Sequence, residues 1–204
     1  MDGQDHALSI LKLMPAATLW EAAGKRGDMA PRIKPLFPEA RVAGPAFTVK
    51  MFPGETFAVV RAVAEAPAGS VIVIDAGAAE RGATWGGSVT LAAMRKGING
   101  VISNGAVRDL GDILHARFPV FAIGSTLVAG LRGHEGWLNV AIGIGETIVN
   151  PGDLIVGDLD GVVVIPVSEW VQVAERAVAR RHDELERDKR LLRGEALADV
   201  LKIG

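Results

Sequence analysis

The clearest hydrophobic pattern lies between residues 71 and 112. Val71 to Ile74 is an unbroken β-branched run, which is typical of a strand buried on both faces. Ser88 is expected to cap a following helix and Gly97 to end it, with helical spacing at Val89, Ala92, Ala93 and Lys96. Val101 and Ile102 begin a second strand. The pattern predicts a parallel strand–helix–strand unit, which binds ligands beyond the carboxyl ends of its strands.

Before this unit, the apolar spacing predicts two short helices and a strand. One helix is stopped by Pro15, and the second runs from near Thr18 to Gly24 or Gly27. The proline-rich residues 29–45 are expected to be irregular, and residues 46–51 alternate as a strand. Residues 56–65 have helical spacing that is expected to direct three side chains to the core: Phe57, Val60 and Val63.

After the unit, residues 119–123 predict a short strand and residues 124–136 a glycine-rich loop. Residues 138–149 and 154–165 are expected to be strands separated by a Pro-Gly-Asp turn. The acidic run that ends at Gly161 has too few ligands for a calcium loop and predicts a hairpin turn with this glycine at positive φ. From residue 168 an apolar stripe and charges of both signs predict a solvated or subunit-bridging helix.

Length and composition predict one α/β domain over residues 1–204, with N-terminal helices in 1–28 and a C-terminal helical tail in 168–204. The net charge of −2 argues against nucleic acid as a main partner. The chain has no cysteine, and its four histidines are scattered, so neither disulfides nor catalytic zinc is expected. No leader or membrane-spanning run is evident, so we expect a cytoplasmic protein without a membrane partner.

The carboxyl edge of the predicted unit carries usable chemistry. Asp75, Asn104, Gly105, Arg108 and Asp109 are expected to converge there with the helix start. The amides of Gly87, Ser88, Val89 and Thr90 would bind a carboxylate, and the glycines at 86 and 87 would leave room for it.

Two neighbouring side chains extend this prediction. Arg108 offers donors to an oxyanion, and Asp109 is an oxygen ligand suited to Mg²⁺ or Mn²⁺. Alternatively, these two residues form a solvated surface pair and the glycines only make turns. Arg132, His134 and Glu135 are further polar candidates in the glycine-rich loop.

Several segments resemble one family. These are Trp-Gly-Gly at 85–87, Asn-Gly-Ala-Val-Arg-Asp at 104–109 followed two residues later by Asp112, and the blocks at 41–50 and 151–166. They resemble the family of the 4-hydroxy-4-methyl-2-oxoglutarate aldolases and the regulator of ribonuclease activity A. The resemblance implies a layered domain of the swivelling β/β/α type and a homotrimer or hexamer. It also implies that a glutamate from the terminal helix of a neighbouring subunit completes the site, with Glu184 as the best match and Glu186 as the fallback.

The resemblance implies a divalent-metal-dependent lyase that cleaves a C–C bond of a 2-oxo acid to give pyruvate, as an aldolase, an oxaloacetate decarboxylase or both. Many of the aldolases resembled carry an acid 21 positions before the arginine, where this chain has Gly87. Proton transfer would then fall to Asp75, Glu184 or solvent. The alternatives are a non-catalytic ring that binds and inhibits a ribonuclease or helicase, and a metabolite-binding scaffold.

Overall fold

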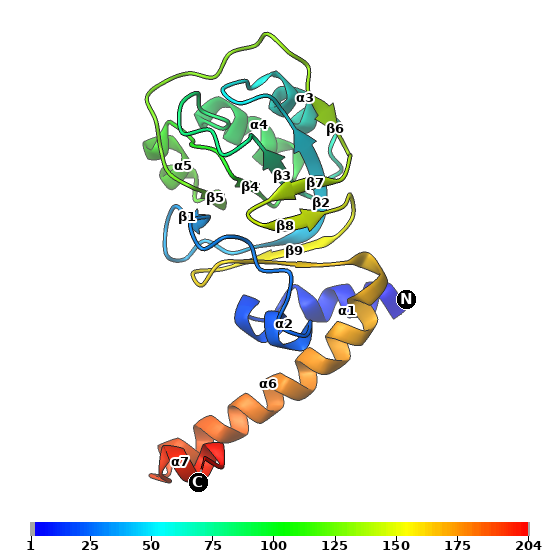
Figure 1. Cartoon of the computed structure of the whole chain (residues 1–204), viewed down its shortest axis with the longest axis vertical. Helices are drawn as coiled ribbons and strands as arrows, with labels where there is room; N and C mark the ends of the chain where they lie inside the picture. Colours follow the sequence, from blue (N-terminus) through cyan, green and yellow to red (C-terminus); the bar gives the residue numbers. More distant parts are fainter. Residues whose placement is uncertain (1–2, 204) are drawn as a thin grey trace.

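A computed structural model describes residues 3–203 and contains one large mixed sheet (Figure 1). Its strand order is β1-β5-β4-β3-β2-β9-β10, with β6 paired to the end of β2. The strands span β1 Lys34–Pro35, β2 Val42–Lys50, β3 Val71–Asp75, β4 Gly100–Ser103, β5 Val120–Ala122, β6 Trp137–Leu138, β9 Leu154–Gly157 and β10 Val162–Ile165. Strands β2 to β5 are parallel, whereas β1, β6, β9 and β10 add antiparallel pairs. The predicted α/β class is confirmed.

Strand β2 joins the parallel and antiparallel parts of the sheet. Residues 42–45 pair with β9, and residues 46–50 pair with β3. The strand therefore begins four residues before the predicted Ala46, and the prediction that all of 29–45 is irregular was wrong. Pro45 lies inside the strand in register with Leu154. Burial of the paired segment outweighs the local preference of proline for a turn.

Three helices cover one face of the parallel strands (Figure 1). They are α3 Phe57–Glu65, α4 Gly87–Lys96 and α5 Leu110–Ala116. Helix α4 ends at Gly97 with φ of 77°, as predicted. The predicted inward face of α3 was partly wrong, because Val60 is exposed and Ala58, Val59 and Ala62 are buried instead. The orientation of α3 on the sheet decides which face of the helix is buried, and the spacing of residues within the helix does not encode that orientation.

The opposite face is covered by a second layer built around the hairpin of β7 Ile142–Ile144 and β8 Thr147–Val149. The long strand predicted over 138–149 is thus divided among β6, β7 and β8, and the one over 154–165 is the hairpin β9–β10. Gly145 and Glu146 turn the first hairpin with positive φ. Gly161, at φ of 154°, lies in the second turn, which confirms the predicted hairpin.

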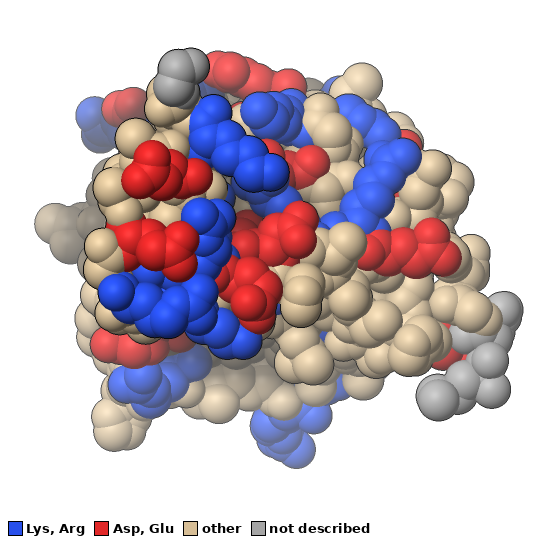
Figure 2. Space-filling view, turned by 90° about the horizontal axis from the view of Figure 1, so that it is seen from below, with Lys and Arg blue, Asp and Glu red and all other residues tan. Residues whose placement is uncertain are grey.

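The N- and C-terminal helices form a third cluster against β9 and β10. Here α1 Gly3–Leu11 and α2 Ala16–Ala22 pack on the first half of α6 Trp170–Leu192, which follows the short 3₁₀ helix η1 Val167–Glu169. The second half of α6 extends away from the sheet and carries α7 Leu197–Leu201 to the far end of the molecule (Figure 1). Basic and acidic side chains are intermixed on that end (Figure 2). Among the described residues no helix is long and apolar enough to cross a bilayer.

Candidate active site at the start of helix α4

The carboxyl edge of the β3–α4–β4 unit brings three of the predicted site residues together: Gly87, Arg108 and Asp109. The amide of Arg108 donates to the carbonyl of Trp85 at 3.0 Å, which holds the loop after β4 beside the start of α4. The amide of Gly87 donates to Oδ2 of Asp109, also at 3.0 Å. Nε of Arg108 lies 3.4 Å from the same oxygen. The predicted convergence of Gly87, Arg108 and Asp109 is therefore confirmed.

A cavity of about 140 Å³ opens at this point. Arg108 and Asp109 line it, with side chains that are 44% and 36% exposed. The rest of the wall comes from three other segments: Thr56 and Val60; Ala83, Trp85, Gly86, Ser88 and Val89; and Ala129, Gly130 and Arg132. The charged groups of the wall face a small space that opens to solvent, which is a usual setting for a binding site.

The first turn of α4 contributes two free amides to this cavity. Within residues 3–203, the N–H groups of Ser88 and Val89 have no protein acceptor. The other two predicted donors are already engaged, because Gly87 binds Asp109 and the amide of Thr90 donates to the carbonyl of Gly86. The side chain of Thr90 accepts from the Trp85 indole at 2.8 Å, so its contribution is to hold the wall. Ser88 makes no side-chain cap, and Gly86 takes the N-cap position.

The backbone of Asp109 has φ of 55° and ψ of 43°, in the left-handed region that aspartate tolerates better than most residues. This conformation begins α5. Its Oδ2 receives the Gly87 amide, whereas Oδ1 has no protein partner in the described part of the chain. Asp109 thus offers one unoccupied carboxylate oxygen.

Asp75 stands at the end of β3, outside the lining of this cavity. Its Oδ1 accepts from the amide of Gly77 at 3.1 Å and from Nδ2 of Asn104 at 2.9 Å. Oδ1 of Asn104 in turn accepts from the amide of Ala76 at 2.6 Å. Asp75 and Asn104 therefore brace the two strand ends against each other. Gly105 is buried in the same region, where its amide donates to Oγ of Ser103.

Asp112 is a carboxylate beside the site that the pattern of residues 86–109 did not single out as functional. A Cβ added to Gly87 would lie 2.5 Å from Oδ2 of Asp112 and 3.1 Å from its Cβ. The space that a side chain at 87 would need is thus filled by the carboxylate of Asp112. A sequence signal existed, because Asp112 follows Asp109 by three residues at a helix start and therefore lies on the same face.

Glu184 lies on α6 and has partners within its own chain. Its carboxylate accepts from Oγ1 of Thr18 at 3.1 Å and from Nη1 of Arg181 at 3.2 Å, and its side chain is only 15% exposed. Arg180 lies beside it, with Nε at 3.4 Å and with Nη2 bound to Glu21. Glu186 is paired with Lys189. The contribution of either glutamate to a neighbouring subunit stays a prediction.

The loop of residues 124–136 supplies Arg132 to the cavity, whereas His134 and Glu135 do not line it. Nδ1 of His134 lies 3.0 Å from Oε1 of Glu55, and Glu135 pairs with Arg61. Hydrogen bonds from His134 and from the Gly133 amide hold the pKa of Glu55 below the usual value for a glutamate. Glu55, Thr56 and Gly130 were not predicted as site residues, because nothing in their local pattern indicates that the two loops meet.

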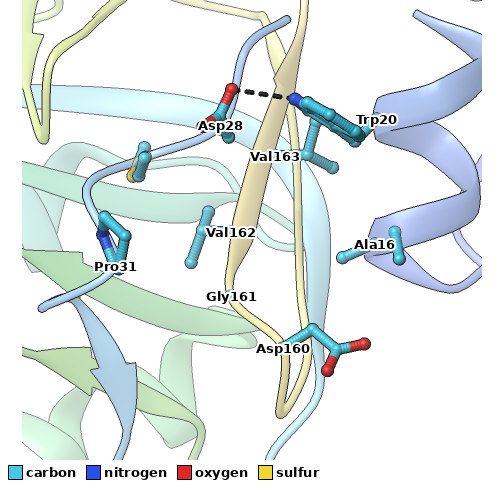
Figure 3. A pocket seen from close by; sticks show the side chains of 10 residues that line it. Ala16, Trp20, Asp28, Pro31, Asp160, Gly161, Val162 and Val163 are labelled. Atoms are coloured by element: carbon cyan, nitrogen blue, oxygen red, sulfur yellow. Dashed lines mark hydrogen bonds between the residues drawn. The ribbon is translucent and has the colours of Figure 1, made fainter. Parts of the chain in front are cut away.

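A different cavity, of about 260 Å³, lies between α2 and the β9–β10 hairpin (Figure 3). Its lining is largely apolar, and Nε1 of Trp20 donates to Oδ1 of Asp28 at 2.8 Å across one end. Asp160 lies at the other end of the labelled group. This cavity holds no cationic side chain and so lacks the chemistry seen around Arg108.

The model of the RraA-like family, described as aldolase/RraA, matches residues 14–164. The chain belongs to the RraA-like family. A protein of Halalkalibacterium halodurans, provisionally named 4-hydroxy-4-methyl-2-oxoglutarate aldolase, is 36% identical over 178 residues, which are 87% of this chain and 85% of that protein. An uncharacterized protein of Methanocaldococcus jannaschii is 36% identical over 97% of this chain and 95% of its own length.

Two solved structures share the fold. An uncharacterized protein from Pseudomonas syringae superposes with a TM-score of 0.85 at 27% identity, over 96% of both chains. The RNA-processing inhibitor RraA from Thermus thermophilis superposes with a TM-score of 0.69 at 26% identity, over 74% of this chain and 92% of that protein. The RraA-like family therefore includes relatives named as aldolases and relatives named as inhibitors.

Proposed function

We propose that this RraA-like protein is a divalent-metal-dependent lyase that cleaves a C–C bond of a 2-oxo acid to give pyruvate. The observation that carries the proposal is the grouping of the Arg108 guanidinium, the Asp109 carboxylate and the free amides of Ser88 and Val89 around one cavity. The aldolase names of its relatives support the reaction class. The candidate substrates are 4-hydroxy-4-methyl-2-oxoglutarate and oxaloacetate.

The residues present fit a weakly chelated Mg²⁺ or Mn²⁺. Oδ1 of Asp109 is an available hard oxygen donor beside the cavity. Within residues 3–203, no group of three or more His, Asp or Glu side chains could hold a metal ion. A single carboxylate suffices for Mg²⁺, which commonly keeps several waters and binds through one or two carboxylates and the substrate. When bound, such an ion supplies a Lewis acid next to the keto group.

The side chains and amides of the site each bind a different part of the substrate. The amides of Ser88 and Val89, at the positive end of α4, bind the carboxylate at C1 of the substrate. Arg108 faces the keto oxygen at C2. The C3–C4 bond then breaks: oxaloacetate loses CO2, whereas 4-hydroxy-4-methyl-2-oxoglutarate loses a second pyruvate as its C4 hydroxyl gives up a proton to a base. The electron pair of the broken bond moves into the C2–C3 enolate, and the guanidinium stabilises the negative charge on the oxygen. A proton delivered to C3 then completes pyruvate.

We propose that the Asp112 carboxylate is the group that holds the transferred proton and delivers it to C3 of the enolate. Gly87 lacks the acid that many aldolases carry there, and the Asp112 carboxylate fills the adjoining space. Asp75 is less suitable because its Oδ1 is already bound to Asn104 and Gly77. Neither carboxylate lines the cavity itself, but that of Asp112 adjoins Gly87, whose two chain neighbours do. A positioned general acid or base typically contributes about 10²–10⁴ in rate.

The test is pyruvate release from oxaloacetate and from 4-hydroxy-4-methyl-2-oxoglutarate, with Mg²⁺ and with a chelator. We expect the chelator to abolish release and Arg108→Gln to lower kcat on the order of 10²–10³, because one oxyanion donor is lost. Arg95→Gln is the matched control, since Arg95 is exposed on α4 away from the lining. Full activity in Arg108→Gln refutes the assignment.

The similarity to the RNA-processing inhibitor RraA makes a non-catalytic regulator the second candidate. Absence of turnover with both oxo acids, together with inhibition of a ribonuclease, would favour it. We also propose that copies of the chain associate into a trimer or hexamer through the projecting tail. Leu192, Leu197 and Ile203 are exposed there, which supports burial against another copy. Sedimentation of the full chain and of a chain ending before Arg187 tests this association.

A further inference from the structure

A second arginine lines the cavity of the candidate active site. Arg132 comes from the loop after β5, and Arg108 comes from the loop after β4. Arg108 has an acidic neighbour, because its Nε lies 3.4 Å from Oδ2 of Asp109. Arg132 forms no ion pair and no side-chain hydrogen bond with any residue of the described range 3–203. Its guanidinium is therefore available to a ligand.

The loop is held in place on both sides of Arg132. The amide of Leu131 donates to the carbonyl of Gly54, and the amide of Thr56 donates to the carbonyl of Leu131, both at 2.8 Å. On the other side, the amide of Gly133 donates to Oε2 of Glu55 at 2.7 Å. These contacts fix the backbone at the residues immediately before and after Arg132, so its side chain starts from a defined position.

Glu55 is the centre of this anchor. It is 6% exposed, and its carboxylate binds both Gly133 and His134. The His134 ring also contacts Phe52, with ring centroids 5.0 Å apart. Gly130 packs closely on the opposite wall, since an added Cβ would lie 2.6 Å from the carbonyl oxygen of Ala83. A loop with this many fixed points differs from a freely solvated one.

The charges of the wall indicate what Arg132 would bind. Arg108 and Arg132 contribute two positive charges, and Asp109 contributes one negative charge, so the lining carries a net charge of +1. A carboxylate at the Ser88 and Val89 amides would leave Arg132 without a counter-ion. A planar guanidinium is suited to a carboxylate, with which it forms two parallel hydrogen bonds.

We propose that Arg132 is a specificity-determining residue that binds the distal carboxylate of a dicarboxylic 2-oxo acid. The proposal rests on the proposed function for the position of the first carboxylate. It adds that discrimination between dicarboxylic and monocarboxylic oxo acids resides in the loop of residues 124–136. In this arrangement Arg108 binds the keto oxygen and Arg132 binds the distal carboxylate.

The test measures binding rather than turnover. The wild-type chain and Arg132→Gln are titrated by calorimetry, in the presence of Mg²⁺, with 2-oxoglutarate as the dicarboxylate and with pyruvate as the monocarboxylate. We expect Arg132→Gln to weaken 2-oxoglutarate binding by about 10–100-fold, the usual effect of losing a charged hydrogen-bond partner. Pyruvate affinity should change less than about twofold, because its only carboxylate binds at α4.

Two further variants sharpen the result. Arg132→Lys keeps the charge but loses the planar fork, so its affinity for 2-oxoglutarate should fall between those of the wild type and Arg132→Gln. Arg81→Gln is the control, since Arg81 is exposed and outside the lining. Equal losses for both ligands, unchanged binding of 2-oxoglutarate, or no binding of 2-oxoglutarate by the wild type would each overturn the proposal.

This experiment separates the inference from the proposed function. A wild-type chain that cleaves oxaloacetate but whose affinity does not depend on Arg132 would refute only the inference. A chain that binds 2-oxoglutarate through Arg132 but releases no pyruvate from any oxo acid would support the inference and refute only the lyase.

Discussion

Adding a side chain at Gly87 tests the contact between the starts of helices α4 and α5. A Cβ at this position would lie 2.5 Å from Oδ2, 3.2 Å from Cγ and 3.1 Å from Cβ of Asp112. The carboxylate can rotate away, but its Cβ must move by a few tenths of an ångström. Overpacking of this kind costs about 1–3 kcal/mol. The better helix propensity of alanine offsets it by up to about 1 kcal/mol, so Gly87→Ala should lower the free energy of unfolding by about 0.5–2 kcal/mol.

The same substitution should behave differently when Asp112 is already alanine. Most of the overlap is then gone, and Gly87→Ala should be neutral or stabilise the chain by up to about 1 kcal/mol. Asp112→Ala also removes a favourable acid from the first turn of α5. This loss is common to the single and the double variant, so it cancels when the four proteins are compared in a double-mutant cycle. We therefore expect a coupling energy of about 0.5–3 kcal/mol.

The assay is urea unfolding of the wild type, the two single variants and the double variant. A coupling energy within about 0.3–0.5 kcal/mol of zero would refute the contact, because distant sites add to within that margin. Activity extends the test to the proposed chemistry. Asp112→Ala should lower kcat by about 10²–10⁴, and adding Gly87→Asp should restore part of it by returning a carboxylate to the same space. No restoration in a folded double variant would argue against Asp112 as the proton-holding group.

Three further predictions concern the surroundings of the site. Asn104→Ala should destabilise the chain by about 1–3 kcal/mol in urea unfolding, because the buried Ala76 amide loses its acceptor. Asp109→Asn keeps the left-handed backbone and should weaken Mn²⁺ binding at least about tenfold by water-proton relaxation; equal binding would exclude Asp109 as the ligand. Glu55 has a lowered pKa in the folded state. The contribution of its carboxylate to the stability of the fold is therefore complete above the unfolded-state pKa and is lost as pH falls through the folded-state pKa. Glu55→Gln should accordingly reduce hydrogen-exchange protection of the Gly133 amide at neutral pH and should have little effect in acid; a loss independent of pH would contradict this reasoning.

Predictions that depended on contiguous residues agree best with the structure. The run Val71 to Ile74, the helix that ends at Gly97 and the strand beginning near Val101 were all located from spacing alone. The fold then brings Arg108 and Asp109 to the start of α4 because successive parallel strands place their carboxyl ends at one edge. Two other predictions from local sequence failed because packing decides the outcome: Val60 on α3 is exposed, and strand β2 continues through Pro45.

By itself the sequence determined the β3–α4–β4 unit, the edge at which a ligand would bind and the pairing of an arginine with an acid there. These features follow from periodicity and from the geometry of a parallel crossover, which are local. Only the tertiary structure decided that Arg132 reaches the same cavity, since its loop is anchored by Glu55, 78 positions before Gly133. It likewise decided that Asp112 fills the space beside Gly87 and that Glu184 contacts Thr18. Such contacts depend on how whole elements pack against one another, and the spacing of residues within one element does not encode that.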